Sequence, residues 1–103
     1  MKIYISGKIS GTSDYIQRFH NAELKLKEKY PDAEIVNPVV LSQELEKKIK
    51  HPSWLEYMRN CVPVLYTCSH IYMLPDWLDS KGAKYEHQTA VSMGIIILDS
   101  LML

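Results

Sequence analysis

Residues 2–20 read KIYISGKISGTSDYIQRFH, and this stretch decides the fold. Residues 2–6 are mainly β-branched or aromatic, which predicts a short buried strand. The turn at residues 7–11 contains two glycines, and the Thr, Ser or Asp at positions 12–14 can cap a helix that we expect to run to about Tyr30. A strand that leads through such a turn into a helix is the first half of a βαβ unit.

The remainder of the chain repeats this alternation. Short apolar runs predict three more strands, at Ala33–Asn37, Ile71–Leu74 and Ile95–Leu98. Helical spacing and caps predict further helices, at Leu41–Lys50 (short, or only a helical turn), from a Ser53 cap to about Leu65, and at Ala83–Met93. Parallel strands joined by helices predict one α/β domain over residues 1–103, a flavodoxin-like three-layer sandwich with a parallel sheet of four to five strands.

Three single residues sharpen these boundaries. Glu56 lies three residues after Ser53, which is the spacing of a capping box. Pro63 falls inside the same helix and predicts a kink or an early break. Gly94 follows the last helix and is expected to be its C-terminal cap.

Composition excludes several classes of function. Twelve basic and twelve acidic side chains cancel, so no net field attracts a nucleic acid polymer or an anionic membrane. The longest apolar runs have strand length, which favours a cytoplasmic protein without a signal peptide or membrane span. A 103-residue domain buries only roughly 60–65% of its unfolded surface, so we expect a homodimer.

The two cysteines do not predict a metal site. Cys61 and Cys68 are seven residues apart, and only His70 lies near them in the sequence. Zinc sites need more ligands than this. We therefore expect reduced packing residues, with no metal and no cofactor.

Ligands of parallel α/β sheets bind beyond the carboxyl ends of the strands, which selects residues 7–13 and 75–82. The first of these loops has two glycines and several hydroxyls before a helix, and both a plain tight turn and an anion cradle fit this pattern. The second leads to Glu86, one helical turn after Gly82. The helix dipole would keep a carboxylate there ionised as a nucleophile or base, whereas an ordinary solvated helix glutamate is the alternative.

Three motifs carry a resemblance to a known family. They are IYISGxIxG from residue 3, WxxYMR from residue 54, and IYMLPxWxxSxGAxxE from residue 71. With these motifs the chain resembles a small phage and bacterial family of unassigned function, DUF4406. That family in turn resembles the nucleoside 2-deoxyribosyltransferases and the 2'-deoxynucleoside 5'-phosphate N-hydrolases, through the first strand and turn and residues 80–86.

The resemblance implies a site for a small nucleoside or nucleotide. The nucleophile of the enzymes falls on Glu86, which would attack C1' of a deoxyribose, and the tyrosine that holds it falls on Tyr4. Ser80 occupies the position where hydrolases of 5'-phosphorylated substrates carry serine and transferases carry aspartate. The implied substrate-binding residues are Gly7, Ile9, Ser10, Gly11, Asp76, Trp77, Ser80 and Gly82. Trp77 can stack on a base or belong to the core.

Two positions depart from the enzymes. Cys61, with Asn60 beside it, stands where an aspartate assists the leaving base, and Ser69 stands where the third strand begins with a second aspartate. Losing a general acid typically costs about 10²–10⁴-fold in rate, although Asp76 or Asp79 could substitute. The predicted function is cleavage of the N-glycosidic bond of a 2'-deoxynucleoside 5'-monophosphate. A non-catalytic nucleotide-binding module, a 2-deoxyribosyltransferase and a purely structural role are the alternatives.

Overall fold

A computed structural model describes residues 1–102 and contains one parallel sheet of four strands. The strands are β1 (Lys2–Ser6), β2 (Glu34–Val36), β3 (His70–Met73) and β4 (Ile96–Asp99), in the spatial order β2-β1-β3-β4. The chain leaves β1 on one side for β2 and later returns on the other side for β3. The carboxyl ends of β1 and β3 are therefore the switch point at which such sheets bind ligands.

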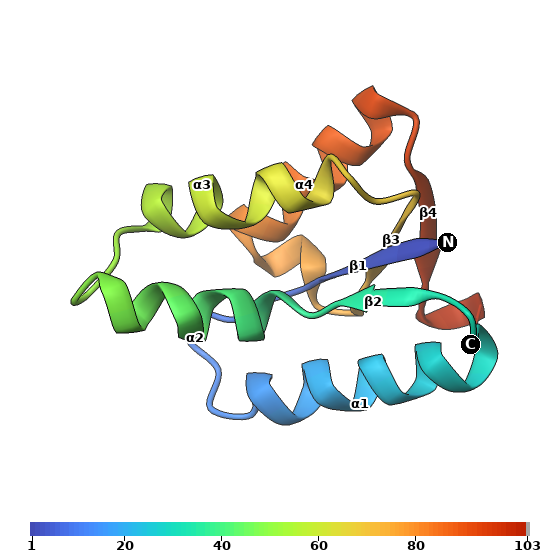
Figure 1. Cartoon of the computed structure of the whole chain (residues 1–103), viewed down its shortest axis with the longest axis horizontal. Coiled ribbons are helices and arrows are strands. Elements are labelled where there is room, and N and C mark those ends of the chain that lie inside the picture. Colours follow the sequence, from blue (N-terminus) through green and yellow to red (C-terminus); the bar gives the residue numbers. More distant parts are fainter. Residues whose placement is uncertain (103) are drawn as a thin grey trace.

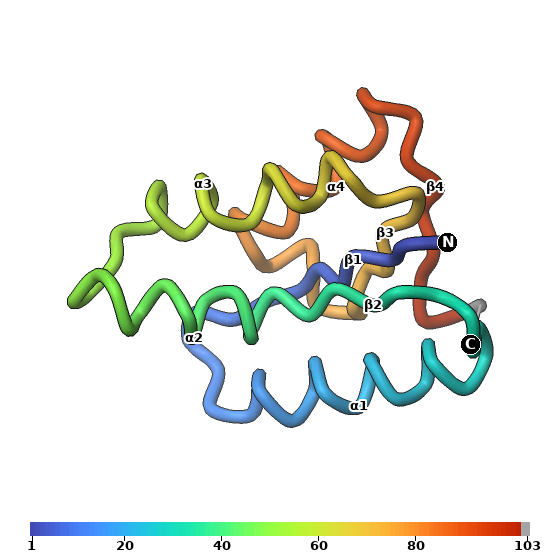
Figure 2. The backbone as a smooth tube through the Cα atoms, in the orientation of Figure 1, coloured from blue at the N-terminus to red at the C-terminus, as the bar shows by residue number. Residues whose placement is uncertain are grey.

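Helices cover both faces of the sheet, as Figures 1 and 2 show. They are α1 (Tyr15–Lys29), α2 (Pro38–Lys48), α3 (Trp54–Leu65) and α4 (Lys81–Met93), with two short 3-10 turns, η1 (Trp77–Asp79) and η2 (Ser100–Met102). Helix α1 packs against one face, and α3 and α4 pack against the other. The element order and the three-layer α/β architecture that the sequence predicts are confirmed.

Strand β1 supplies a core residue to each face in turn, because successive side chains of a strand point in opposite directions. Ile3 and Ile5 pack in the α1 core with Phe19, whereas Tyr4 packs in the α3–α4 core. Ser6 shares the face of Tyr4 and is fully buried. The second core thus begins with two hydroxyl groups at the carboxyl end of β1.

Local signals at the helix ends are confirmed at two positions. The Ser53 hydroxyl accepts a hydrogen bond from the Glu56 N–H at 3.1 Å, and the Glu56 carboxylate accepts one from the Ser53 N–H at 3.0 Å. Gly94 ends α4 with φ +72°, a conformation that glycine adopts without steric cost.

Other boundaries differ from the predicted ones. Helix α2 begins at Pro38 rather than Leu41, because Asn37 caps it and proline fits the first helical position. Helix α3 continues through Pro63 to Leu65, so the predicted early break is wrong. Helix α4 begins at Lys81, two residues before the predicted start, with Ser80 as its N-cap.

The α2–α3 pair extends past the carboxyl ends of the strands and forms a wall beside them (Figure 1). Its tip contains His51, which has φ +54°. No helix within residues 1–102 is long and apolar enough to cross a membrane.

Candidate active site

Glu86 is a buried carboxylate held by two hydroxyl groups of β1. Its side chain comes from the first half of α4 and is 7% exposed. The Tyr4 hydroxyl donates to Oε2 at 2.5 Å, and the Ser6 hydroxyl donates to Oε1 at 2.7 Å. Tyr4 and Ser6 share a face because they are two positions apart on the strand. The sheet therefore presents a fixed pair of donors to both oxygens of one carboxylate.

Burial dominates the electrostatics of this group. Removal from water raises the pKa of Glu86 to about 7, and the hydrogen bonds from Tyr4 and Ser6 offset only part of that rise. Burial and the neighbouring Glu86 charge raise the pKa of Tyr4 well above its ordinary value, so Tyr4 stays protonated and donates. Burial thus opposes the ionisation that the sequence predicts for a carboxylate near the start of a helix. A pKa of about 7 allows Glu86 to be either a carboxylic acid or a carboxylate around neutral pH.

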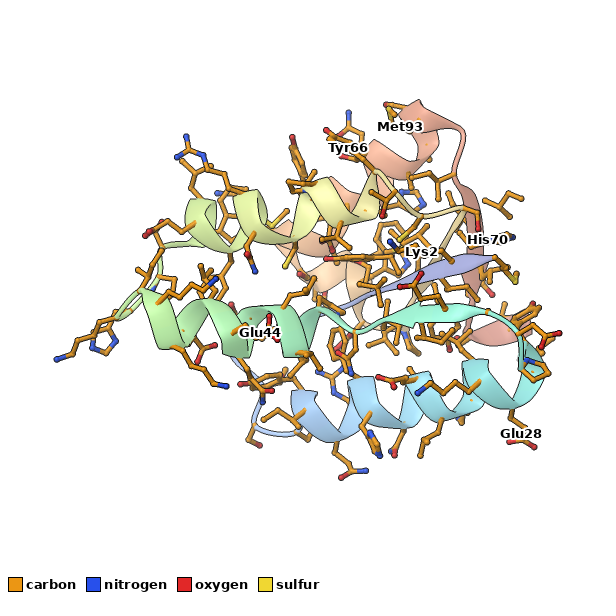
Figure 3. All side chains as sticks on the ribbon, in the orientation of Figure 1. Lys2, Glu28, Glu44, Tyr66, His70 and Met93 are labelled. Atoms are coloured by element: carbon orange, nitrogen blue, oxygen red, sulfur yellow. The ribbon has the colours of Figure 1, made fainter. Side chains whose placement is uncertain are left out.

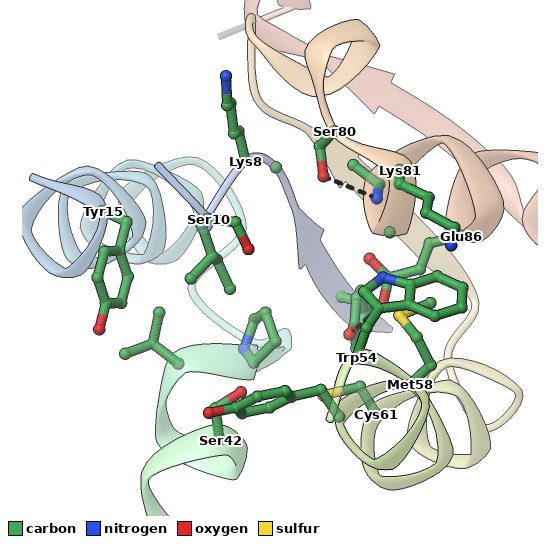
Figure 4. A pocket seen from close by; sticks show the side chains of 18 of the residues that line it. Lys8, Ser10, Tyr15, Ser42, Trp54, Met58, Cys61, Ser80, Lys81 and Glu86 are labelled. Atoms are coloured by element: carbon green, nitrogen blue, oxygen red, sulfur yellow. Dashed lines mark hydrogen bonds between the residues drawn. The ribbon is translucent and has the colours of Figure 1, made fainter. Parts of the chain in front are cut away.

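The carboxylate lies in the wall of a cavity of about 300 Å³. This volume is at the lower end of the range for small-molecule sites, roughly 300–1,000 Å³. The cavity lies at the carboxyl ends of β1 and β3, between the β1–α1 turn, the start of α4 and the α2–α3 wall. In Figure 4, Lys8, Ser10 and Ser80 lie on one side of it and Ser42 and Cys61 on the opposite side.

The β1–α1 turn brings backbone N–H groups to the cavity. Gly7, Ile9 and Ser10 line it, and within residues 1–102 the N–H groups of Ile9 and Ser10 have no hydrogen-bond acceptor. A Cβ at Gly7 would lie 2.6 Å from the side chain of Leu74, the residue that follows β3, so glycine fits here without a shift of Leu74. Gly11 does not line the cavity. Its φ of +78°, which glycine adopts easily, allows the β1–α1 turn to form.

Arg18 joins the two loops at this end of the sheet. Its guanidinium donates to Asp76 Oδ2 at 2.6 Å, to the Lys8 carbonyl at 2.8 Å and to the Thr12 hydroxyl at 3.2 Å. Asp76 also accepts the Lys8 N–H at 3.2 Å. Asp76 does not line the cavity. Its hydrogen bonds instead fasten the β3–η1 loop to the β1–α1 turn. Arg18 could not be found from the sequence, because the partner that gives it this role, Asp76, is 58 positions away.

The start of α4 forms the adjoining wall. Ser80 lines the cavity while its hydroxyl accepts the Ala83 N–H at 3.1 Å (dashed in Figure 4). Gly82 also lines the cavity, and a Cβ there would lie 3.3 Å from the sulfur of Met58. The Lys81 ammonium lies 4.0 Å from the centroid of the Trp54 ring, which connects α4 to α3.

Trp77 does not line the cavity. Its ring stacks on His87, with centroids 4.2 Å apart and an angle of 21° between the planes, and it packs against the α3–α4 core. The aromatic residues that do line the cavity are Tyr4, Tyr15, Trp54 and Tyr57. The core interpretation of Trp77 fits this placement, and the base-stacking one does not.

The two positions that depart from the enzymes lie in different places. Cys61 lines the cavity, and burial and the nearby Glu86 charge raise the pKa of its thiol to about 11. Ser69 lies at the amino end of β3, where its hydroxyl accepts the Lys2 N–H at 3.0 Å. Figure 3 shows Lys2 and His70 at that opposite end of the sheet. The residue at position 69 thus contributes nothing to the cavity.

Sequence reasoning missed most of the α2–α3 wall. The residues of α2 that line the cavity recur at helical spacing and are Pro38, Val39, Ser42, Gln43 and Glu46. Those of α3 include Tyr57 and Met58. The i, i+3, i+4 spacing of these residues could have indicated that they share one face of α2. Only the tertiary structure shows that this face lines the cavity.

The described residues contain no group of three or more His, Cys, Asp and Glu side chains that could hold a metal ion. The carboxylates that line the cavity are Glu46, Asp79 and Glu86, and its cations are Lys8 and Lys81. The cavity lining thus combines carboxylates and ammonium groups with hydroxyls and the Cys61 thiol.

Comparison with known proteins identifies one family. The model of a family described as "Domain of unknown function (DUF4406)" matches residues 1–99, and the chain belongs to that family. No curated protein and no solved structure matches the chain.

Proposed function

We propose that this DUF4406 protein hydrolyses the N-glycosidic bond of a 2'-deoxynucleoside 5'-monophosphate. The observation that carries the proposal is the Glu86 carboxylate, buried at a cavity wall and held by Tyr4 and Ser6. A carboxylate with fixed hydrogen bonds and a pKa of about 7 is suited to act as a nucleophile near neutral pH.

In the proposed reaction, ionised Glu86 attacks C1' of the deoxyribose and forms an ester. The bond between C1' and the base nitrogen breaks, its electron pair leaves with the base, and the base takes up a proton. Water then attacks C1' of the ester, which releases 2-deoxyribose 5-phosphate and returns the carboxylate. The attacking water loses one proton to solvent, and this proton balances the one that the base has taken up. Tyr4 and Ser6 keep the carboxylate in one orientation, because each donates to a different oxygen.

The proposed phosphate subsite is the side of the cavity formed by the β1–α1 turn and the start of α4. The N–H groups of Ile9 and Ser10 point to no protein acceptor among residues 1–102, and Lys8 and Lys81 both line the cavity. The first N–H groups of a helix lack intrahelical partners and attract anions, so α4 adds a favourable dipole. Arg18 and Asp76 hold the two loops in register.

A second candidate is a non-catalytic nucleotide-binding module, and Cys61 favours it. A thiol with a pKa of about 11 is a poor proton donor to a leaving base. Asp79 also lines the cavity and is the carboxyl group that could take this role in a hydrolase.

A third candidate is a 2-deoxyribosyltransferase, which would form the same ester and pass the deoxyribosyl group to a second base. Ser80, where transferases carry aspartate, argues against this third candidate.

The test is release of free base from each of the four common 2'-deoxynucleoside 5'-monophosphates, followed by chromatography. We expect release by the wild-type protein and a loss of more than about 10³-fold in Glu86→Gln. Glu28→Gln, on the exposed side of α1, is the matched control and should keep full activity. Tight binding without release would select the binding module, and activity in Glu86→Gln would remove Glu86 from the mechanism. A new nucleotide formed with added free base would indicate a transferase.

A cytoplasmic homodimer remains a prediction. Light scattering after size-exclusion chromatography measures the oligomeric state directly. A monomer at micromolar concentration would contradict the predicted dimer without affecting the chemistry proposed for Glu86.

A further inference from the structure

Arg18 and Asp76 hold both backbone groups of Lys8 in the β1–α1 turn. The Lys8 N–H donates to Asp76 Oδ1 at 3.2 Å, and the Lys8 carbonyl accepts from the Arg18 guanidinium at 2.8 Å. Arg18 closes the ring with a bond of 2.6 Å to Asp76 Oδ2. The two side chains are only 26% and 27% exposed, so salt screens this ion pair less than one on the open surface. The peptide groups on both sides of Lys8 therefore have fixed orientations.

Arg18 also holds the next carbonyl of the turn, through Thr12. Its guanidinium donates to the Thr12 hydroxyl at 3.2 Å, and that hydroxyl donates to the Ile9 carbonyl at 3.0 Å. The Thr12 N–H donates to the same carbonyl at 3.4 Å. Two successive carbonyl groups, those of Lys8 and Ile9, are thus held in place. A guanidinium is suited to such a role, because its N–H donors form a rigid planar fork.

Holding these carbonyls also directs the N–H groups that follow them. Every peptide bond within residues 1–102 is trans, and a trans peptide points its C=O and its N–H in opposite directions. The N–H groups of Ile9 and Ser10 therefore point away from the groups that hold the carbonyls, and no acceptor within the described chain meets them. Ile9 and Ser10 line the cavity, whereas Arg18 and Thr12 do not. The turn thus keeps its free donors on the side of the cavity.

We propose that Arg18, together with Asp76, is a positioning residue that preforms the β1–α1 turn for the 5'-phosphate of the substrate. The inference rests on the proposed function, because it assumes that a nucleotide phosphate occupies this side of the cavity. A phosphate oxygen accepts hydrogen bonds, so it pairs with the free N–H groups of Ile9 and Ser10. Arg18 does not touch the phosphate. It keeps the two donors aligned before the nucleotide binds.

The size of the expected effect follows from this alignment. A hydrogen bond to a charged group changes affinity by about 10- to 100-fold. Without Arg18 the turn must become ordered when the phosphate binds, and this ordering reduces affinity. Loss of Arg18 should therefore weaken a monophosphate by about 10- to 100-fold. A deoxynucleoside has no phosphate to meet the turn, so its affinity should change by less than about threefold.

The experiment measures dissociation constants by calorimetry for each of the four common 2'-deoxynucleoside 5'-monophosphates and for its parent 2'-deoxynucleoside. The full-length protein carries Glu86→Gln so that no substrate is consumed. Adding Arg18→Met removes the guanidinium but keeps an unbranched side chain, and we expect it to weaken the monophosphates selectively. Adding Lys25→Met instead removes a cation from the exposed side of α1 and should leave all affinities unchanged.

Two more variants separate orientation from charge. Arg18→Lys keeps the positive charge but lacks the planar fork, so it should lose nearly as much monophosphate affinity as Arg18→Met. Thr12→Val removes the hydroxyl between Arg18 and the Ile9 carbonyl and leaves the ion pair with Asp76 in place. It should weaken monophosphates by about threefold to tenfold, because only one of the two carbonyls is released. Thr12→Val also tests the proposal if loss of Arg18 prevents folding.

The outcomes separate this inference from the function beneath it. Equal losses for monophosphates and their parent nucleosides would make Arg18 a structural residue only, and wild-type affinity in Arg18→Lys would reduce its role to charge. Either result would overturn the positioning role and leave the nucleotide site intact. Failure of every nucleotide and nucleoside to bind would overturn the nucleotide site, and the role of Arg18 with it.

Discussion

The two faces of β1 are equally buried but differ in chemistry. Ile3 and Ile5 point toward α1, Tyr4 and Ser6 point toward α3 and α4, and all four side chains are fully buried. Burying a hydroxyl or a carboxylate costs free energy unless each group finds a partner. Tyr4 and Ser6 find theirs in Glu86. The face with Ile3 and Ile5 therefore stabilises the fold. The face with Tyr4 and Ser6 holds the buried Glu86 carboxylate, and burying that carboxylate costs part of this stability.

The largest effect should come from emptying the apolar face. Phe19 of α1 is fully buried against β1. Phe19→Ala should lower the free energy of unfolding by about 3–5 kcal/mol, because it removes buried contacts and leaves a void. Chemical denaturation measures this loss. Residual folded protein should still bind nucleotide with unchanged affinity, and a loss of affinity per folded molecule would contradict the division between the faces.

The pH dependence of stability should report the polar face. The pKa of Glu86 is about 7 in the folded protein and 4.5 when unperturbed, so the folded state binds more protons between these values. Stability should therefore be highest below about pH 4.5 for this group and fall as pH rises to about 7. A difference of about 2.5 pKa units corresponds to about 3 kcal/mol.

The Glu86→Gln variant is the reference for that measurement. Its free energy of unfolding, measured at several pH values, should lack this slope, and the difference between the two curves isolates Glu86. Parallel curves for wild type and variant would show that Glu86 titrates at an ordinary pKa and that its burial is not costly.

The smallest effect compares two neighbours on β1. Tyr4→Phe and Ile5→Val should each lower stability by about 1–1.5 kcal/mol, the first through a lost hydrogen bond and the second through a lost methylene. Only Tyr4→Phe removes a bond that lowers the pKa of Glu86, so only this variant should shift the pH profile of base release upward. The same shift in Ile5→Val would mean that general loosening of the strand, rather than the Tyr4 hydroxyl, controls the carboxylate.

Local signals in the sequence were sufficient for the element order and for several helix ends. The Ser53–Glu56 capping box and the Gly94 C-cap depend only on residues a few positions away, so both could be predicted without tertiary contacts. The early break expected at Pro63 does not occur, because packing of α3 on the sheet outweighs the local penalty of one proline. Tyr4 and Glu86 are 82 positions apart, so no local signal could predict their contact. It was expected only from the family resemblance.

The sequence by itself determined the alternation of strands and helices, because hydrophobic period and capping are local properties. Only the tertiary structure decided which polar residues share a cavity, that Arg18 fastens two loops, and that α2 contributes Glu46 to the wall. It also decided the protonation of Glu86, because desolvation depends on every atom that excludes water from the carboxylate, and no short stretch of sequence encodes that environment.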